Sequence, residues 1–553
     1  MTSGTALARV RAAYRRNAEA DRPEIWIDLR PQLQAEAEAR EVDARVAAGE
    51  RLPLAGTVLA VKGNIDVAGL PTTAGCPGYA YRPARDAVAV ARLRAAGAVL
   101  LGTTNLDQFA TGLVGTRSPY GAVRNALDPA RVSGGSSSGS AVAVALGIAD
   151  LALGTDTAGS GRVPAAFNGI VGLKPTYGVI PTTGVVPACR SLDCVSVFAR
   201  SVAEAERAHA LMLDAPPTPP ARRPGPWRIA VPDLAQLGEL DPGWDEAWTA
   251  AVRRFAEAGA ELRPLDLTPF DRVAQLLYQG AFVAERHTAV GAFLDKHADS
   301  PDAGIDPVVA GIITGARDLP AHQLFADQYE LDQLRRAALA ELGDADALLL
   351  PTAPGHPTLA EVAADPVGAN ARLGRFTNST NLLGLCALAI PAPAAAPGPP
   401  FGVMLIGRPH TEAALGAIAR LPQAVPPVRL AVVGAHLSGE PLNHQLLALG
   451  ARLVTVTTTA PQYRLYALPT DPPKPGLVRV AEGGATVRAE VWELSAEGLG
   501  RLLARLPSPM TLGSVRLADG SAVTGFLCEP AALGSDTPDI TGYGGWVAYR
   551  KEL

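Results

Sequence analysis

Two segments rich in serine and glycine carry the residue types that amide hydrolysis requires. The first, GGSSSGS, begins at Gly134, and the second, TDTAGSGR, begins at Thr155. Amide hydrolysis needs a nucleophile, a base that accepts its proton, and N–H donors for the oxyanion that forms. Serine hydroxyls can act as nucleophiles, and glycine lets the backbone approach a substrate closely. The two segments therefore favour a serine enzyme that cleaves amides.

Other functions of a loop rich in glycine and serine do not fit the first segment. A phosphate-binding P-loop follows GxxxxGK[ST], and no lysine follows the second glycine here. A dinucleotide-binding turn needs GxGxxG and a downstream acidic residue, and neither is present. A flexible linker is also disfavoured, because the loop runs directly into the apolar, helix-like stretch SAVAVALGIA.

Lysine fits the role of the base better than histidine. The first histidine is His209, far from both segments in the sequence, although a Ser-His-Asp triad assembled in space stays open. Only five of the 49 Lys and Arg residues are lysines, and a buried lysine can lose its proton whereas arginine cannot. Lys62, between the apolar run TVLAV and Gly63, is the candidate base. A lysine that merely extends from a strand end toward solvent is the alternative.

The elements expected around these residues alternate between strands and helices. Residues 5–20 and 29–49 carry apolar side chains at a spacing of three to four, which predicts two helices. From Gly56 onward, short apolar runs such as AVLLGTTN and LALGTDTAG end in loops and alternate with helix-like stretches such as AVAVARLRAAG. This alternation predicts an α/β domain with a largely covered sheet.

The length of 553 residues is too great for a single core, so we expect at least two domains. The proline-dense stretch 215–227 is interpreted as a loop within the first domain, and PQAVPPVR at 422–429 as a linker. Beyond the linker, short strands rich in Val, Thr and Tyr predict an independent α+β or β-barrel-like domain. The expected boundaries are a first domain over 1–425, with N-terminal helices in 1–50 and a catalytic core in 51–425, and a second domain over 428–553.

Composition narrows the possible partners. The net charge of −5 and the pI near 6.0 argue against binding to nucleic acid. The N-terminus lacks an apolar signal core, and the apolar stretch 382–407 contains too many prolines for a membrane span. The five cysteines form no CxxC pair, which indicates neither a disulfide framework nor a zinc site. We expect a cytoplasmic protein without metal, organic cofactor or membrane attachment.

The segment from Gly56 to Pro181 resembles the amidase signature family. The matching pieces, in the order found in that family, are GTVLAVKGNIDVAGLPTTAG, GGSSSGS, GTDTAGSGR and GIVGLKPTYGVIP. The resemblance implies a layered α/β/α domain with a covered mixed sheet. It also implies that Ser160 is the nucleophile and that Ser136, 24 residues earlier, carries its proton toward neutral Lys62.

The same resemblance assigns roles to the backbone around these serines. It implies a cis peptide bond before Ser136 and an oxyanion hole formed by N–H groups around Thr157, Ala158 and Gly159. The remaining serines of the first segment are expected to support the loop rather than to react: Ser137, Ser138 and Ser140.

A further segment, LLYQGAFVAERHTAV at 276–290, resembles the allophanate hydrolase branch of this family, in which a Tyr and an Arg lie eight residues apart. Here they are Tyr278 and Arg286. On one helix this spacing places the side chains about 80° apart, so both could face one pocket. An Arg fork and a Tyr hydroxyl would suit the carboxylate of allophanate. The alternative is that Arg286 pairs with an acidic residue on a solvated helix face.

The tail resembles the C-terminal domain of allophanate hydrolases in VVGAHLSGEPLNHQLLALGARLV and DITGYGGWVAYR. That domain is similar in plan to the γ-glutamylcyclotransferase-like fold, and the resemblance implies a second step, decarboxylation of N-carboxycarbamate. His436 in the glycine-flanked first loop is the candidate proton donor. A histidine with a purely structural role is the alternative.

The resemblance as a whole implies hydrolysis of allophanate to ammonia and carbon dioxide in urea catabolism. It implies urea carboxylase as the functional partner and a homodimer as the assembly. One alternative is a broad amidase acting on biuret-like or malonamide-like compounds. A tRNA-linked amidotransferase subunit is disfavoured because the tail has no basic surface, and the tail could instead be a binding or dimerisation module.

Overall fold

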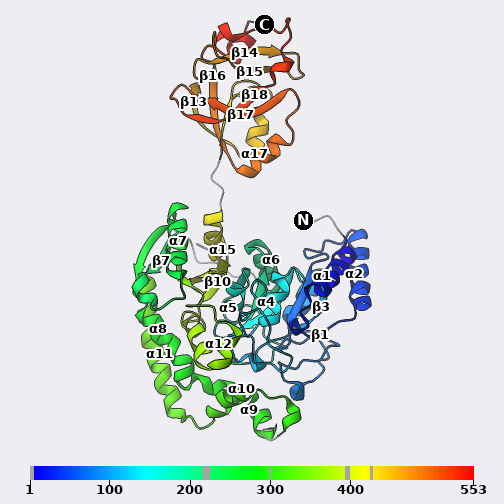
Figure 1. Ribbon diagram of the computed structural model, residues 1–553, viewed down its shortest axis with the longest axis vertical. Coiled ribbons are helices and arrows are strands. Elements are labelled where there is room, and N and C mark those ends of the chain that lie inside the picture. Colours follow the sequence, from blue (N-terminus) through cyan, green and yellow to red (C-terminus); the bar gives the residue numbers. More distant parts are fainter. Residues whose placement is uncertain (1–4, 216–223, 298–299, 393–398, 424–427, 553) are drawn as a thin grey trace. The chain divides into compact units, whose positions relative to one another are not determined.

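The computed structural model describes residues 5–215, 224–297, 300–392, 399–423 and 428–552. The chain divides into two units, Met1–Pro422 and Gln423–Leu553, each with its own hydrophobic core (Figure 1). Part of the predicted loop at 215–227 and part of the predicted linker at 422–429 lie outside the described residues.

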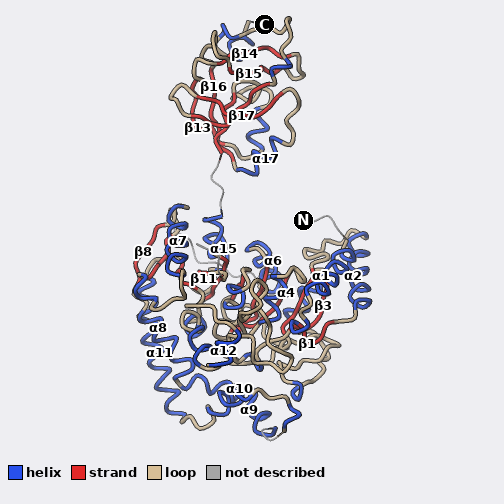
Figure 2. Tube along the Cα trace, viewed as in Figure 1, coloured by secondary structure: helices blue, strands red, loops and turns tan. Residues whose placement is uncertain are grey.

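The first unit is built on a mixed sheet of eleven described strands, which Figure 2 shows in red among the helices. This confirms the predicted layered α/β class. Central strands are buried along their whole length, as expected for apolar runs covered on both faces. In sheet order the strands are β1 (Trp26–Leu29), β3 (Val99–Thr104), β2 (Val58–Lys62), β4 (Leu151–Asp156), β6 (Cys194–Ala199), β5 (Val171–Lys174), β10 (Cys386–Pro391), β11 (Gly402–Gly407), β9 (Ala347–Pro351), β7 (Arg228–Pro232) and β8 (Glu261–Leu265).

Two groups of helices pack on this sheet. In one group α4 contacts α5, and in the other α6 contacts both α3 and α15. Helices α8 to α11 form a separate helical region next to the sheet (Figure 1). The helices of the first unit are α1 (Ala6–Ala20), α2 (Gln32–Ala47), α3 (Val88–Ala95), α4 (Ser138–Ala145), α5 (Val163–Phe167), α6 (Val202–Met212), α7 (Trp244–Glu257), α8 (Thr268–Gln279), α9 (Ala284–His297), α10 (Pro307–Gly315), α11 (Ala321–Leu342), α12 (Leu359–Ala364), α13 (Gly368–Leu373), α14 (Asn378–Leu382) and α15 (Glu412–Arg420).

The expectation of a helix over 29–49 is wrong at its start. The chain first forms β1, which pairs antiparallel with β3, and α2 begins only at Gln32, after Pro31. The Trp26 ring nitrogen donates a hydrogen bond to the Asn17 side chain at 2.7 Å, which ties this strand to α1. A four-residue strand is too short to show a clear period in the sequence, so only its partner strand reveals it.

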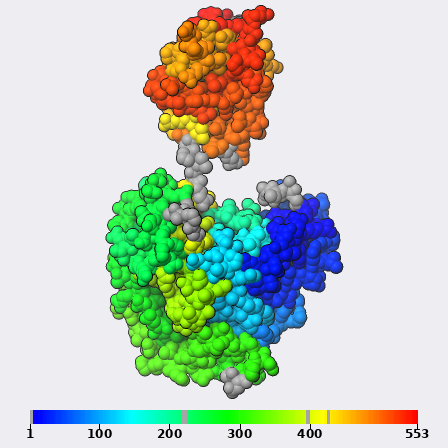
Figure 3. Space-filling model, viewed as in Figure 1, coloured from blue at the N-terminus to red at the C-terminus, as the bar shows by residue number. Residues whose placement is uncertain are grey.

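The sheet places Lys62 and Thr155 near the carboxyl ends of two adjacent parallel strands. Strand β2 runs parallel to β4, with Val61 opposite Leu153, so Lys62 and Thr155 emerge at the same ends of adjacent strands. Segments distant in sequence also meet in this unit: Arg131 forms a β-bridge with Thr358. In Figure 3 the yellow-green surface formed by residues near 360 accordingly lies beside the cyan surface formed by residues near 130.

The second unit contains a five-stranded sheet in the order β13-β16-β12-β18-β17 and a separate β14–β15 pair. The predicted likeness to the γ-glutamylcyclotransferase-like fold stays a prediction. None of the helices in the described ranges combines the length and apolar character needed to cross a bilayer. The elements of this unit are β12 (Val428–Val432), α16 (Asn443–Ala448), β13 (Arg452–Thr458), β14 (Tyr463–Leu468), β15 (Lys474–Arg479), β16 (Arg488–Leu494), α17 (Ala496–Leu503), β17 (Met510–Arg516), β18 (Ala522–Cys528) and α18 (Trp546–Arg550).

Candidate active site

The side chain of Lys62 is fully buried and lies between two hydroxyl groups. Its Nζ atom donates hydrogen bonds to Ser136 Oγ at 2.8 Å and to Thr155 Oγ1 at 2.7 Å. Burial lowers the pKa of Lys62 to about 7, although nearby Asp107 and Asp193 act in the opposite direction. The structure therefore brings the predicted base and the predicted bridging serine together, with an amine that can be neutral near physiological pH.

The loop that carries Ser136 is held by the carboxylate of Asp107. The peptide bond between Gly135 and Ser136 is cis, as expected from the family resemblance. A Cβ at Gly135 would lie 2.0 Å from Asp107 Oδ2, so only glycine fits at this position. The backbone N–H of Asp107 donates to the Ser136 carbonyl at 3.1 Å, and its carboxylate accepts N–H groups from Gly115 and Arg117.

The other serines of this loop bind main-chain carbonyl groups. Ser137 Oγ donates to the Thr155 carbonyl at 3.1 Å, and Ser138 and Ser140 donate to the carbonyls of Asn105 and Leu153. Their hydroxyl protons are therefore committed to the loop and to the neighbouring strands.

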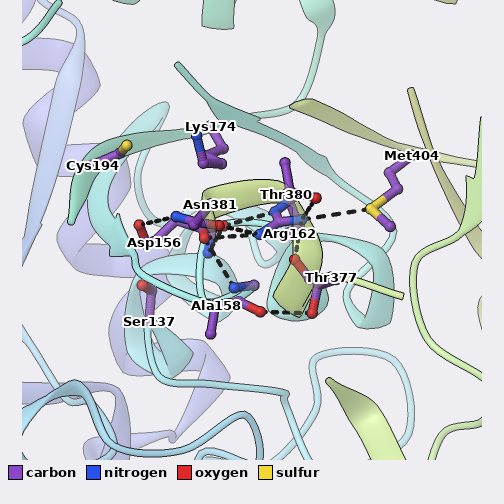
Figure 4. Close-up of polar contacts among 12 residues, drawn as sticks. Ser137, Asp156, Ala158, Arg162, Lys174, Cys194, Thr377, Thr380, Asn381 and Met404 are labelled. Atoms are coloured by element: carbon purple, nitrogen blue, oxygen red, sulfur yellow. Dashed lines mark hydrogen bonds and ion pairs between the residues drawn. The ribbon is translucent and has the colours of Figure 1, made fainter. Parts of the chain in front are cut away.

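The loop that carries Ser160 is organised by a buried ion pair between Asp156 and Arg162 (Figure 4). Arg162 Nε and Nη2 donate to the two oxygens of Asp156 at 2.9 and 3.0 Å, and the N–H groups of Gly159 and Gly161 donate to the same carboxylate. Burial alone would raise the pKa of Asp156, but the Arg162 charge and these hydrogen bonds hold it below its usual value. The loop closes tightly around a permanent charge pair.

Residues of the α14 region brace this loop from more than 200 positions away in the sequence. Arg162 donates to the Thr380 hydroxyl at 2.8 Å and to Asn381 Oδ1 at 2.9 Å, and the Thr377 hydroxyl donates to the Ala158 carbonyl at 2.7 Å (Figure 4). Sequence analysis missed these residues because no local pattern marks them. Only the charged residues flanking AGSG could have indicated a pair.

Ser160 itself is 3% exposed, and its hydroxyl makes no hydrogen bond within the described part of the chain, Ser136 included. Of the predicted oxyanion-hole donors, the N–H of Gly159 is engaged by Asp156. The N–H groups of Thr157, Ala158 and Ser160 donate to no protein acceptor among the residues described, so they can serve a substrate oxygen. The Thr157 hydroxyl donates to the buried Asp193 carboxylate at 2.5 Å, which orients this turn.

Tyr278 and Arg286 lie together, but not on one helix as predicted. Tyr278 belongs to α8 and Arg286 to α9, because the first helix ends at Gln279 and the second begins only at Ala284. Arg286 Nη2 donates to the Tyr278 hydroxyl at 2.8 Å and Nη1 donates to Thr111 Oγ1 at 2.9 Å.

Arg286 does not lie on a solvated helix face. It is 1% exposed, and no carboxylate of the described residues lies within ion-pair distance. Its Nε also has no hydrogen-bond partner. A buried guanidinium without a counter-ion is costly unless an anion joins it, so this geometry suits an anionic ligand.

His436 lies in a separate pocket of the second unit. Its ring stacks on Phe526 with centroids 4.9 Å apart, and Nε2 lies 3.2 Å from Gln445 Oε1. Burial lowers the pKa of His436, so the ring is neutral over a wider pH range than in water. A cavity of about 170 Å³ adjoins it, and Lys474 and Arg505 contribute to the lining.

Comparison with known proteins extends over both units. Residues 9–415 match the amidase family, and residues 428–551 match the allophanate hydrolase C-terminal domain. The urea amidolyase of Saccharomyces cerevisiae is 42% identical over 552 residues, covering 91% of this chain but 30% of the relative, so the chain spans about a third of that protein. The 2-amino-5-chloromuconic acid deaminase of Comamonas testosteroni is 35% identical and covers 70% of this chain and 85% of its own.

Solved structures with the same fold include a selenomethionine-substituted allophanate hydrolase from Kluyveromyces lactis. It is 39% identical, with a TM-score of 0.70, and the match covers 100% of this chain and 97% of the other. The urea amidolyase of the same organism matches equally well over 36% of its own length.

Replacing Arg162 should destabilise the first unit strongly. We expect Arg162→Leu to lower the free energy of unfolding by about 3–5 kcal/mol, because Asp156 would remain buried without a counter-charge. The matched control is Arg253→Leu, which removes an exposed pair with Glu257 and should change stability by less than about 1 kcal/mol. Urea-induced unfolding followed by tryptophan fluorescence measures both, and equal effects would contradict the prediction.

Proposed function

The chain belongs to the amidase family and carries an allophanate hydrolase C-terminal domain, and we propose from this that it hydrolyses allophanate to ammonia and carbon dioxide in urea catabolism. The observation that supports the reaction class is the buried Lys62 amine in hydrogen-bond contact with Ser136. The observation that supports the substrate is the buried, unpaired guanidinium of Arg286 beside Tyr278.

In the proposed mechanism neutral Lys62 accepts the proton of Ser136 while Ser136 accepts that of Ser160. The Ser160 oxygen attacks the terminal carbonyl of allophanate, and the free N–H groups of the Thr157–Ser160 turn stabilise the oxyanion. The proton returns through Ser136 to the departing nitrogen, so ammonia leaves and an acyl-enzyme forms. Water then attacks this intermediate through the same proton path and releases N-carboxycarbamate.

Tyr278 and Arg286 would bind the carboxylate of the substrate during these steps. The two oxygens of that carboxylate can accept hydrogen bonds from a guanidinium and a phenolic hydroxyl, which together fix its orientation. Fixing one end of a small molecule places its other end at the nucleophile, which is the main advantage such a site can supply.

The second unit would act on the product. We assign to the protonated form of His436, which burial makes a stronger acid, the donation of a proton to the nitrogen of N-carboxycarbamate as carbon dioxide leaves. Urea carboxylase would supply the allophanate, and the urea amidolyases to which this chain is similar are longer chains. Five free, buried cysteines fit a reducing cytoplasm, and a homodimer remains the expected assembly.

The rate of amide cleavage should depend on the protonation of Lys62. Since its pKa lies at about 7, we expect kcat/KM to fall by about tenfold for each pH unit below 7 and to level off above it. Lys62→Arg, which stays protonated, should lose about 100- to 10,000-fold of activity. A pH–rate profile measures this, with Ser160→Ala as the inactive control that unfolds like the wild type. A flat profile through pH 7 would contradict the assignment.

Removing the guanidinium should discriminate between substrates. We expect Arg286→Gln to lower kcat/KM for allophanate by about 10- to 100-fold, because charged hydrogen bonds contribute about 1.5–3 kcal/mol. Acetamide, which has no carboxylate, should be cleaved as by the wild type. Arg272→Gln, on the exposed side of α8, is the matched control. Equal losses on both substrates would favour a structural role, and faster wild-type turnover of biuret or acetamide than of allophanate would favour a broad amidase.

His436→Ala should separate the two steps. We expect the first equivalent of ammonia to appear at the wild-type rate and the second to lag by about tenfold or more, because loss of carbon dioxide would lack its proton donor. Time courses of ammonia and carbon dioxide release measure this, with the exposed His444→Ala as control. An unchanged time course would leave this unit as a binding or dimerisation module, which sedimentation of the full chain would then examine.

A further inference from the structure

A large cavity of the first unit adjoins Tyr278 without belonging to the site described above. Its volume is about 680 Å³, and residues of helices α8, α10 and α13 form part of its walls. Cavities of this size hold ligands much larger than a ureido carboxylate, so a single substrate molecule at Arg286 leaves this space unexplained.

Arg117 supplies a second buried, unpaired guanidinium in the wall of this cavity. It is 3% exposed and donates only to carbonyl oxygens, those of Thr111 at 3.0 Å and Pro366 at 2.6 Å. Its Nε has no hydrogen-bond partner, and no described carboxylate lies within ion-pair distance of its side chain. Carbonyl oxygens do not neutralise a full charge, so this position favours an anion.

The same short segment links Arg117 to the proposed substrate site. The Thr111 carbonyl accepts from Arg117, and the Thr111 hydroxyl accepts from Arg286. Tyr278 lines the cavity while its hydroxyl accepts from Arg286. An anion at Arg117 would therefore lie in a cavity that shares Tyr278 with the site at Arg286.

The lining of the cavity also includes an acceptor. The Asn378 side-chain oxygen is buried and has no hydrogen-bond partner in the described chain. The other charges of the cavity, Asp271 and Arg375, form an ion pair at 3.2 Å and so cancel each other. The buried unsatisfied groups among the described lining residues are thus one cationic donor and one neutral acceptor, which match a small molecule bearing a carboxylate and an N–H group.

We propose that this cavity is a second binding site for ureido carboxylates, in which Arg117 binds the carboxylate and Asn378 accepts from an N–H group. The site holds a substrate molecule before it moves past Tyr278 to Arg286. This inference rests on the proposed function, because the ligand class is that of the proposed substrate. Raising the local concentration of an anion next to a buried site increases the rate of productive encounter.

The test is the stoichiometry of malonamate binding to the full chain carrying Ser160→Ala, which cannot turn the probe over. Calorimetry should show two bound equivalents. Adding Arg117→Gln should weaken one of them by about 10- to 100-fold, adding Arg286→Gln should weaken the other, and Arg272→Gln should change neither. A single equivalent in the Ser160→Ala chain, or two unaltered equivalents in the presence of Arg117→Gln, would overturn the proposal.

A second variant covers the outcome in which Arg117→Gln does not fold. Asn378→Leu retains every contact of Arg117 and should still weaken one equivalent, by about fivefold or more. Acetamide should not bind at this site, and equal binding of acetamide and malonamate would also overturn the proposal. Binding is measured without turnover, so the two proposals can fail separately. If the Ser160→Ala chain binds two malonamate molecules but the wild-type chain does not hydrolyse allophanate, the proposed reaction is refuted and the second site stands.

Discussion

The buried ion pair of Asp156 and Arg162 is the interaction on which the geometry of the candidate active site depends. The loop between them consists of small residues that offer little surface for packing, so hydrophobic packing alone does not define its conformation. The carboxylate of Asp156 instead gathers two backbone N–H groups and the guanidinium fork into one closed turn. Because neither charge can be left alone in this interior, the turn and its serine are held together.

The buried basic residues of this unit differ in function according to whether the side chain can lose its proton. Lys62 can give up its proton in a dry environment, and it does so within a useful pH range. Arg286 and Arg117 cannot, and they stay charged without a protein counter-ion in the described chain. Burial therefore makes the lysine a neutral base, whereas it leaves the two arginines as charged sites that favour binding of an anion.

Asp107 and Asp193 form no ion pair with Arg117 or Arg286 within the described residues, although these positive charges act to lower the pKa of the two carboxyl groups. Asp107 accepts backbone N–H groups of the loop that carries Ser136, and Asp193 accepts the Thr157 hydroxyl and two backbone N–H groups. Burial raises the pKa of both, although the same hydrogen bonds favour their charged forms. In the second unit the pocket of His436 follows a different plan, with a neutral ring stacked on an aromatic neighbour.

The sequence by itself determined the features that depend on neighbours in the chain. The alternation of apolar runs with helix-like stretches sufficed to predict the α/β fold. The resemblance to the amidase signature family implied the Lys62–Ser136 contact, which the structure shows at 2.8 Å. Burial patterns and turn residues are local, and they can be read directly.

Tertiary structure alone decided the rest, because it depends on contacts between distant segments. The bracing of the Ser160 loop by α14 joins residues more than 200 positions apart, and strand β1 is recognisable only from its pairing with β3. Tyr278 and Arg286 come from two successive helices rather than from one. Their predicted proximity is therefore correct for a different geometric reason.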